Sequence, residues 1–321
     1  MRAQITGTGS CLPDQIVTND FLSTIVDTSD EWIRTRTGIR QRHISTEETT
    51  VSLAVEAGRR ALLDAGVLPG DLDLILVATC SADTLVPSTA CQVQSELGAP
   101  KAFAFDLNAA CSGFIYAMTI VDSFIQTGNC KTALVIGVET LSRLVDWKDR
   151  STCVLFADGA GATVVQASDT GVLVTELGAD GTKGEAIYVK SRENCNPFVP
   201  EQKPLDYLYM DGAGVYKFAV KTVPRAIEST LAKAGLTADE IDLYLLHQAN
   251  IRINQAIAKK LKVSMDKVPL NLDRCGNTSA ASIPLLLDEV NKKGMLQSKD
   301  KVVMAGFGAG LTWGVLILEW A

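Results

Sequence analysis

Cys111 is the residue of this 321-residue chain whose surroundings best suit covalent chemistry. It stands between an apolar run at 103–110, which predicts a strand, and a run at 112–121, which predicts a helix. At such a junction the unpaired N–H groups and the dipole of the helix favour a thiolate over a thiol. A lone intracellular cysteine is more often a buried core residue, so the nucleophile hypothesis needs support from elsewhere in the chain.

That support comes from a faint internal duplication. A constant offset, 235 − 66 = 169, relates four pairs of positions in separate segments: Gly66 and Gly235, Asp73 and Asp242, Asn108 and Asn277, Gly137 and Gly306. Because one offset fits helix ends, strand starts and a turn alike, the chain is predicted to contain two similar halves.

The duplication brings two more polar side chains towards Cys111. His247 follows a predicted strand at 243–246, and Asn277 opens the turn that corresponds to the Cys111 turn. All three residues leave the carboxyl ends of strands, where open α/β sheets bind ligands. Pseudo-symmetry would place the two turns face to face, so we expect a Cys–His–Asn constellation. The alternative for Asn277 is a turn or helix-capping residue, and the two roles are compatible.

Each half is predicted as helix, buried strand, turn, strand, helix and strand. The strands are continuous Val/Ile/Leu runs, which are typical of sheets covered by helices on both faces. We therefore expect an α/β fold with five layers, α/β/α/β/α, built from halves at 1–170 and 171–321. The first half carries Cys111, and the second carries His247 and Asn277. The polar, proline-containing stretch 183–210 predicts a loop over their junction.

Composition excludes several classes of function. A net charge of −7 argues against nucleic acid as the main partner. The eight cysteines form no C-x-x-C pair and the chain has two histidines, which argues against a metal site and fits a reducing cytosol. No apolar run reaches membrane-spanning length and the first residues lack a signal-peptide pattern, so we expect a cytoplasmic protein that binds no membrane.

The remaining histidine and cysteines are expected to be structural. His43 has basic neighbours and no nearby nucleophile. Five cysteines lie in apolar segments and are interpreted as small core residues: Cys80, Cys91, Cys130, Cys153 and Cys275. Cys11 and Cys195 lie in predicted loops, with no role assigned.

Five motifs occur in order along the chain: DEWIRTRTGIR at 30–40, NAACSG at 108–113, HQANIR at 247–252, GNTSAAS at 276–282 and GFGAGLTWG at 306–314. Together they resemble β-ketoacyl-[acyl-carrier-protein] synthase III, an initiating condensing enzyme of the thiolase superfamily. The likeness runs from about residue 3 to the C-terminus. It implies a thiolase-like duplicated fold, acyltransferase activity, a homodimer, and no cofactor beyond a coenzyme A thioester used as substrate.

The resemblance also implies a reaction. An acyl-CoA primer, acetyl-CoA above all, would acylate Cys111, and malonyl-acyl carrier protein would then lose CO2 and condense to a 3-oxoacyl-acyl carrier protein. This step begins type II fatty acid synthesis. Backbone N–H groups of Cys111 and Ala309 would hold the oxyanion. His247 and Asn277 would donate hydrogen bonds to the thioester enolate, which a neutral imidazole and a carboxamide can both do.

Further site residues follow from the same resemblance. The contacts to coenzyme A would come from Trp32, Arg36, Arg150, Gly212, Tyr216, Asn250 and Arg252. The docking patch for the acidic carrier protein would be Gln248, Ala249, Asn250, Ile251 and Arg252. The primer pocket would be lined by Val86, Leu141, Phe156 and Leu208. For the Trp/Arg cluster, the alternative is a solvated basic surface with one half-buried tryptophan.

Three positions depart from the family's pattern. Val86 stands where many members carry Phe, contributed across the dimer interface, so longer or branched primers would find room. Ala309 replaces a glycine, which is tolerable at negative φ because the proposed donor is backbone. Gly214 replaces a glutamate.

Two other functions remain open at this stage. One is a starter-unit condensing or acyl-transferring enzyme of polyketide-type metabolism, which would share the Cys, the His and the fold. The other is a non-catalytic acyl-CoA-binding or redox-sensing protein, which would form no acyl-enzyme.

Overall fold

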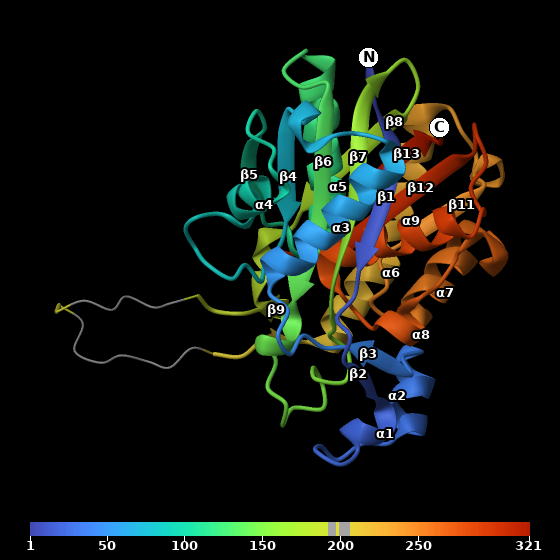
Figure 1. Ribbon diagram of the computed structural model, residues 1–321. Coiled ribbons are helices and arrows are strands. Elements are labelled where there is room, and N and C mark those ends of the chain that lie inside the picture. Colours follow the sequence, from blue (N-terminus) through green and yellow to red (C-terminus); the bar gives the residue numbers. More distant parts are fainter. Residues whose placement is uncertain (192–196, 199–205) are drawn as a thin grey trace.

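Two sheets form the centre of the protein (Figure 1), whose computed structural model describes residues 1–191, 197–198 and 206–321. The first sheet has the order β1 (Arg2–Cys11), β7 (Asp158–Ser168), β6 (Thr132–Thr140), β4 (Leu74–Ala78) and β5 (Phe103–Leu107). The second has the order β11 (Leu243–Leu246), β12 (Lys301–Gly308), β13 (Thr312–Glu319) and β8 (Val172–Ala179). Strands β6, β4 and β5 run parallel, as do β11 and β12.

Helices occupy three layers around the two sheets. Helices α3 (Thr50–Ala65) and α4 (Thr89–Leu97) cover the outer face of the first sheet. Helices α5 (Gly113–Gln126) and α9 (Ser282–Lys292) lie between the sheets, and α6 (Gly212–Ala234) and α7 (Ile251–Leu261) cover the outer face of the second. The predicted five-layer α/β/α/β/α fold is confirmed.

Successive side chains along a strand point to opposite faces of the sheet, and both faces of these sheets are apolar. In β4, Ile75 and Val77 pack beneath α3 and α4, whereas Leu74 and Leu76 join the core of the middle layer. All four side chains are completely buried. Each buried aliphatic side chain of this kind stabilises the fold by about 1.5–3 kcal/mol. The continuous apolar runs of the sequence therefore reflect strands covered on both sides.

The duplication is visible in matching local structure. Gly66 and Gly235 end α3 and α6 in the left-handed region, with φ of 65° and 69°. Asp73 accepts a hydrogen bond from the Thr132 amide at 3.0 Å, and Asp242 accepts one from the Lys301 amide at 2.8 Å. Both pairs obey the 169-residue offset. The proposed boundary between 1–170 and 171–321 falls between β7 and β8, which belong to different sheets, and stays a prediction.

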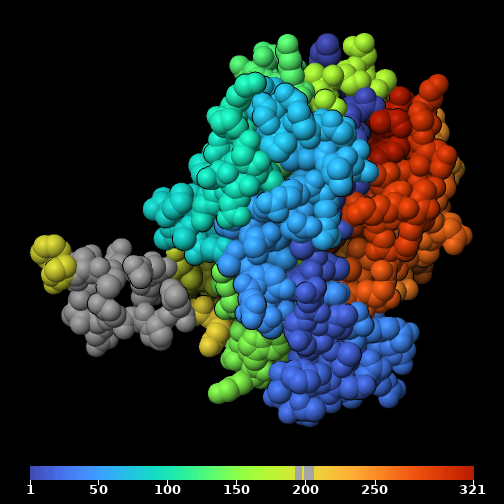
Figure 2. All heavy atoms as spheres, in the orientation of Figure 1, coloured from blue at the N-terminus to red at the C-terminus, as the bar shows by residue number. Residues whose placement is uncertain are grey.

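A smaller N-terminal segment lies against the second half (Figure 2). It contains β2 (Ile16–Thr18), α1 (Asn19–Leu22), α2 (Asp30–Thr37) and β3 (Gln41–His43). Its α2 is fixed to α7, because Asn250 donates to the Arg36 carbonyl and Arg252 donates to the Thr35 carbonyl, at 3.0 and 2.8 Å. The residues that begin α7 thus position α2.

The other elements are short. They are α8 (Leu272–Cys275), β9 (Ile187–Tyr188), β10 (Tyr209–Met210), and the 3-10 helices η1 (Pro69–Asp71), η2 (Ala110–Ser112), η3 (Leu141–Arg143), η4 (Gly181–Ala186), η5 (Ala238–Glu240), η6 (Met265–Lys267) and η7 (Ser279–Ala281). The stretch predicted as a loop at 183–210 contains the ladder of β9 and β10, and its residues 192–196 and 199–205 lie outside the described residues.

One structural prediction on cysteines is wrong, because Cys91 is exposed on α4. Cys80 is half-buried, packs against the core cluster that contains Leu141 and Phe156, and lines a cavity. Cys130, Cys153 and Cys275 are buried as expected, and Cys195 lies outside the described residues. No helix in the described parts of the chain is long and apolar enough to cross a bilayer.

Candidate active site

Cys111 lies in η2, in the tight turn that joins β5 to α5. The amide of Ala110 donates to the side-chain oxygen of Asn108 at 3.1 Å, and Ala110 adopts a φ of 46°. This Asn-stabilised turn directs the chain straight into α5 and leaves Cys111 only 7% exposed. The predicted position at a strand-to-helix junction is confirmed.

The protonation state of Cys111 differs from the expectation of a resting thiolate. Burial raises the pKa of the thiol to about 12, while a hydrogen bond with Ser279 lowers it and the charge of Glu139 raises it. Desolvation therefore outweighs the helix dipole, which is worth at most about 2 kcal/mol. The resting site holds a thiol, and a proton must leave before Cys111 can attack.

His247 follows β11 and is 1% exposed. Its amide donates to the Ala305 carbonyl at 2.9 Å, and its ring meets the Phe307 ring edge-on with centroids 5.2 Å apart. Burial lowers the pKa of the imidazole to about 3, so it is neutral near pH 7. Its Nδ1 is buried with no hydrogen-bond partner. A neutral ring with free hydrogen-bonding capacity suits a donor to substrate.

Asn277 opens a turn that copies the Cys111 turn. Its side-chain oxygen accepts from the Ser279 amide at 3.0 Å, and Ser279 has the same φ of 46° as Ala110. Its own amide donates to the Leu155 carbonyl, and its carbonyl accepts from the Ala157 amide, both at 2.9 Å. With the oxygen engaged, the carboxamide NH2 is the part of the side chain available to a ligand.

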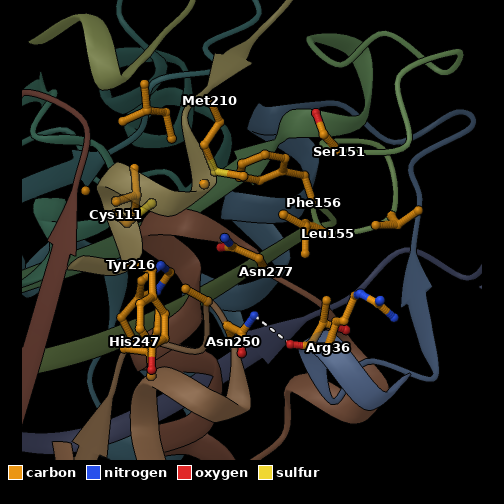
Figure 3. Close-up of a pocket in the computed structure, with 18 of the residues that line it drawn as sticks. Arg36, Cys111, Ser151, Leu155, Phe156, Met210, Tyr216, His247, Asn250 and Asn277 are labelled. Atoms are coloured by element: carbon orange, nitrogen blue, oxygen red, sulfur yellow. Dashed lines mark hydrogen bonds between the residues drawn. The ribbon is translucent and has the colours of Figure 1, made fainter. Parts of the chain in front are cut away.

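Cys111, His247 and Asn277 line one cavity of about 280 Å³ (Figure 3). A second cavity, of about 390 Å³, is also lined by Cys111. Cys111, Phe156 and Ile187 line both cavities. The three polar groups predicted from the sequence are thus brought to one site, and the sulfur stands where two chambers meet.

Aromatic and basic side chains line the first cavity away from Cys111. The guanidinium carbons of Arg36 and Arg150 lie 4.6 and 5.2 Å from the centre of the Trp32 ring. Gly212 and Tyr216, from the first turns of α6, line the same cavity, as does Asn250. Arg252 does not line it, because its guanidinium is turned towards the Thr35 carbonyl.

The segment predicted to dock a carrier protein is only partly on the surface. Gln248 is 1% exposed, and its side chain bonds the Leu246 carbonyl and the Asn271 amide. The docking role assigned to Gln248 is therefore wrong for this structure, since a buried and satisfied amide presents nothing to a partner. Ala249, Asn250 and Ile251 are half-buried, and Arg252 is exposed.

The residues predicted for the primer pocket separate into two groups. Leu141, Phe156 and Leu208 line the second cavity together with Ala309. Val86 does not, and is 84% exposed on the loop between β4 and α4. Ala309 does not adopt a positive φ, which fits the tolerance expected for alanine there. A side chain at Gly214 would lie 2.4 Å from the Asp211 carboxylate that caps α6.

Sequence reasoning missed one group at this site. Glu139 is the penultimate residue of β6 and is fully buried, and its carboxylate accepts from the Ser279 hydroxyl at 3.0 Å. Within the described residues, no group of three or more His, Cys, Asp or Glu side chains is arranged to hold a metal ion. A glutamate that ends the apolar run 133–138 was the available signal for Glu139, because a buried carboxylate needs several donors.

Comparisons with known proteins identify the family of the chain. The family model described as 3-oxoacyl-[acyl-carrier-protein (ACP)] synthase III matches residues 105–181, and the model of its C-terminal part matches 231–320. The β-ketoacyl-[acyl-carrier-protein] synthase III of Clostridium acetobutylicum is 49% identical over 99% of this chain and 98% of its own.

Solved structures extend the match to the fold. The 3-oxoacyl-[acyl-carrier-protein] synthase III of Aquifex aeolicus VF5 has a TM-score of 0.93 and 46% identity, covering 99% of this chain and 100% of its own. The priming β-ketosynthase of the R1128 polyketide pathway has a TM-score of 0.93 and 37% identity, and the match covers 99% of this chain and 96% of the ketosynthase chain. The chain belongs to the β-ketoacyl-[acyl-carrier-protein] synthase III family of the thiolase superfamily.

Proposed function

We propose that this family member carries out the initiating condensation of fatty acid synthesis by forming an acyl-enzyme on Cys111. The observation that carries the proposal is that Cys111 lines both cavities. A thioester whose pantetheine arm lies in the first cavity would present its carbonyl to the sulfur and extend its acyl chain into the second. Attack by the sulfur then transfers the acyl group and releases coenzyme A.

The first cavity would hold the coenzyme A thioester, which is a substrate and no resident cofactor. Trp32 offers an aromatic face beside two guanidinium groups, Arg36 and Arg150, which suit an adenine ring and phosphates. Gly212, Tyr216 and Asn250 would contact the pantetheine arm. Arg252 lies outside the cavity and is assigned to the carrier protein instead of coenzyme A.

His247 and Asn277 would serve the second half of the reaction. Once malonyl-acyl carrier protein has lost CO2, the enolate oxygen would carry negative charge beside the buried side chains of His247 and Asn277. A neutral imidazole and a carboxamide NH2 can both donate to it without losing a proton. The backbone N–H groups of Cys111 and Ala309 would hold the oxyanion formed when the enolate carbon attacks the acyl-Cys carbonyl.

The carrier protein would dock beside α2 and the start of α7, on Ala249, Asn250, Ile251 and Arg252. Arg252 supplies an exposed positive charge on a chain whose net charge is −7. An acidic partner needs such a local patch for orientation. We propose that the enzyme acts in the cytoplasm.

The second cavity would hold the primer acyl chain against Leu141, Phe156 and Leu208. We further propose a homodimer in which Val86 of one chain closes this cavity in the other. The exposed apolar pair Leu85 and Val86, each 84% exposed, supports an interface on that loop. Acetyl-CoA is the proposed primer.

The polyketide alternative has weaker support. The chain is 49% identical to the Clostridium acetobutylicum synthase, against 37% to the priming ketosynthase of the polyketide pathway.

Mass spectrometry after incubation with acyl-CoAs tests the proposal. Acetyl-CoA should add one acetyl group to the peptide that contains Cys111, and Cys111→Ala should remove both this mass and all condensation with malonyl-acyl carrier protein. The variant should unfold at the wild-type temperature. Acylation of another residue, or condensation that survives in Cys111→Ala, would rule out this nucleophile.

A further inference from the structure

Glu139 is a buried carboxylate beneath the proposed active site, and it is surrounded by donors. It accepts from the Ser81 hydroxyl at 2.5 Å, the Cys80 amide at 3.1 Å, the Thr79 hydroxyl at 3.3 Å and the Ser279 hydroxyl at 3.0 Å. The Cys80 thiol adds a further contact at 3.3 Å. These hydrogen bonds stabilise the ionised carboxylate, whereas burial raises its pKa and favours the protonated form. No basic side chain is among these partners.

Ser279 connects this carboxylate to the nucleophile. Ser279 and Cys111 line the same cavity, and the two short helices that carry them, η7 and η2, pack against each other. The Ser279 hydroxyl donates to Glu139, so its oxygen lone pairs are the part left for the thiol. A hydrogen bond between Ser279 and Cys111 also acts on the pKa of the thiol.

The other charged or titratable groups near Cys111 are less suited to accept its proton. Arg143 contacts the Ser81 carbonyl but forms its ion pair with Asp83 at 2.8 Å. His247 lines the first cavity, where the substrate carbonyl would lie between it and the sulfur, and burial lowers its pKa to about 3. Burial instead raises the pKa of Glu139, which makes it a better proton acceptor than an exposed carboxylate.

We propose that Ser279 and Glu139 form a proton relay that takes the proton of Cys111 during acylation and returns it during condensation. The inference rests on the proposed acyl-enzyme function and adds two residues to it. Ser279 would be catalytic, because it touches the reacting sulfur, and Glu139 would act through Ser279.

The protons balance over the full cycle of acylation and condensation. In acylation the Cys111 S–H bond breaks, its proton passes to the Ser279 oxygen, and the Ser279 proton passes to Glu139. The thiolate attacks the thioester carbonyl, and the C–S bond to coenzyme A breaks, so that the coenzyme A thiolate leaves and takes one proton from solvent. In condensation the enolate carbon expels the Cys111 thiolate, which recovers its proton from Glu139 through Ser279. Glu139 is therefore protonated while the acyl-enzyme exists.

Two substitutions test the relay in the full-length enzyme. Ser279→Ala should fold, because Ala110 holds an alanine at the same φ of 46° in the matching turn. Ser279→Ala and Glu139→Gln should each slow acylation of Cys111 by acetyl-CoA at least tenfold. Thr230→Ala, which removes a buried hydroxyl far along α6, is the matched control and should acylate at the wild-type rate.

The charge of Glu139 alone predicts the opposite result. A static negative charge near the sulfur disfavours the thiolate, so Glu139→Gln would speed acylation if no proton moved. An equal or faster rate in Glu139→Gln overturns the relay. A loss of rate in Ser279→Ala with no loss in Glu139→Gln overturns it as well.

Proton uptake by the wild-type enzyme keeps the proposal testable if Glu139→Gln fails to fold. Mixing enzyme with acetyl-CoA at pH 7 in weakly buffered dye should consume about one proton per acyl group bound, because Glu139 keeps the thiol proton. Zero uptake would mean that the thiol proton leaves with coenzyme A, and would overturn the relay. If no acyl group becomes attached to Cys111, the proposed function itself fails.

Discussion

Gly306 lies so close to Cys111 that a Cβ atom built on the glycine would be 3.1 Å from the Cys111 carbonyl oxygen. Gly137, its partner under the 169-residue offset, would place a Cβ 2.2 Å from the carbonyl oxygen of Ala280, which corresponds to Cys111. Each half thus contributes a glycine on which the active-site turn of the other half rests. The sulfur is positioned by the packing of two halves, not by its own turn alone.

Substituting these two glycines should separate stability from activity. Gly137→Ala should be the more destabilising, because the new methyl group meets backbone at shorter range, and overpacking of this kind typically costs about 1–3 kcal/mol. For the same loss in the free energy of unfolding, Gly306→Ala should slow acylation more than Gly137→Ala does, because the new methyl group displaces Cys111 itself. Urea unfolding and acetyl transfer, measured on both variants, would contradict this if the two losses ran in parallel.

Trp32→Ala should raise the KM for acetyl-CoA about tenfold with little change in kcat. Stacking on a Trp ring flanked by two guanidinium groups is worth about 1–2 kcal/mol, and 1.4 kcal/mol corresponds to a factor of ten. Arg34→Ala is the matched control, since Arg34 lies on the same helix but pairs with Asp30 outside the cavity. A similar KM change in both variants would assign the effect to α2 as a whole.

Arg252→Ala should weaken the use of malonyl-acyl carrier protein more than acylation by acetyl-CoA. Its guanidinium is exposed beside α2 and does not line the cavity. Lys233→Ala, an exposed cation at the far end of α6, should affect neither half-reaction. Steady-state kinetics of the two half-reactions measure the difference, and equal losses in Arg252→Ala would argue against a docking role.

Val86→Phe should narrow the range of primers towards acetyl-CoA. Val86 is 84% exposed in the single chain, so an effect on primer length requires that the loop reach the second cavity of a partner copy. A panel of straight and branched acyl-CoAs gives the chain-length profile. Sedimentation of the wild type measures the dimer, and a monomer with an unchanged profile would dismiss both proposals.

His247 should make the protein less stable as the pH falls. Its pKa is about 3 in the folded state and near 6.5 when exposed, so the unfolded chain binds one more proton between these values. The stability associated with this group is complete above about pH 6.5 and falls by about 1.4 kcal/mol per pH unit below it. His247→Phe should flatten that slope in urea titrations between pH 6 and 4.5. An unchanged slope would show that the imidazole is not held neutral.

The sequence was sufficient for the fold and for the three central side chains, and the reason is the duplication. Asn108 and Asn277 are separated by the same offset as the matching helix ends and strand starts. The turns that carry Cys111 and Asn277, and the strand end at His247, could therefore be placed at corresponding positions of two similar halves from the sequence alone. Burial could not be inferred in the same way. The thiolate expected at Cys111 assumed an open helix end, whereas the structure encloses the sulfur between two halves.

The wrong predictions at single residues also arise because the burial of a side chain could not be inferred from the sequence. Gln248 follows a strand within a polar motif, and its burial becomes visible only when Asn271 and Leu246 are seen to satisfy its amide. Cys91 looked like a core residue because its segment contains apolar residues, yet its side chain is exposed on α4. Glu139 drew no attention because its donors come from distant segments, including Ser279 in the other half.

The turn at Ser279 and Ala280 is a rotated copy of the turn at Ala110 and Cys111, with the same φ and the same Asn anchor. The equivalent positions of the two turns carry different side chains at the nucleophile position, Cys111 in one half and Ala280 in the other. The asymmetry of the site therefore comes from side chains and not from the backbone: two turns of the same shape present a sulfur at Cys111 and an amide at Asn277 to one cavity.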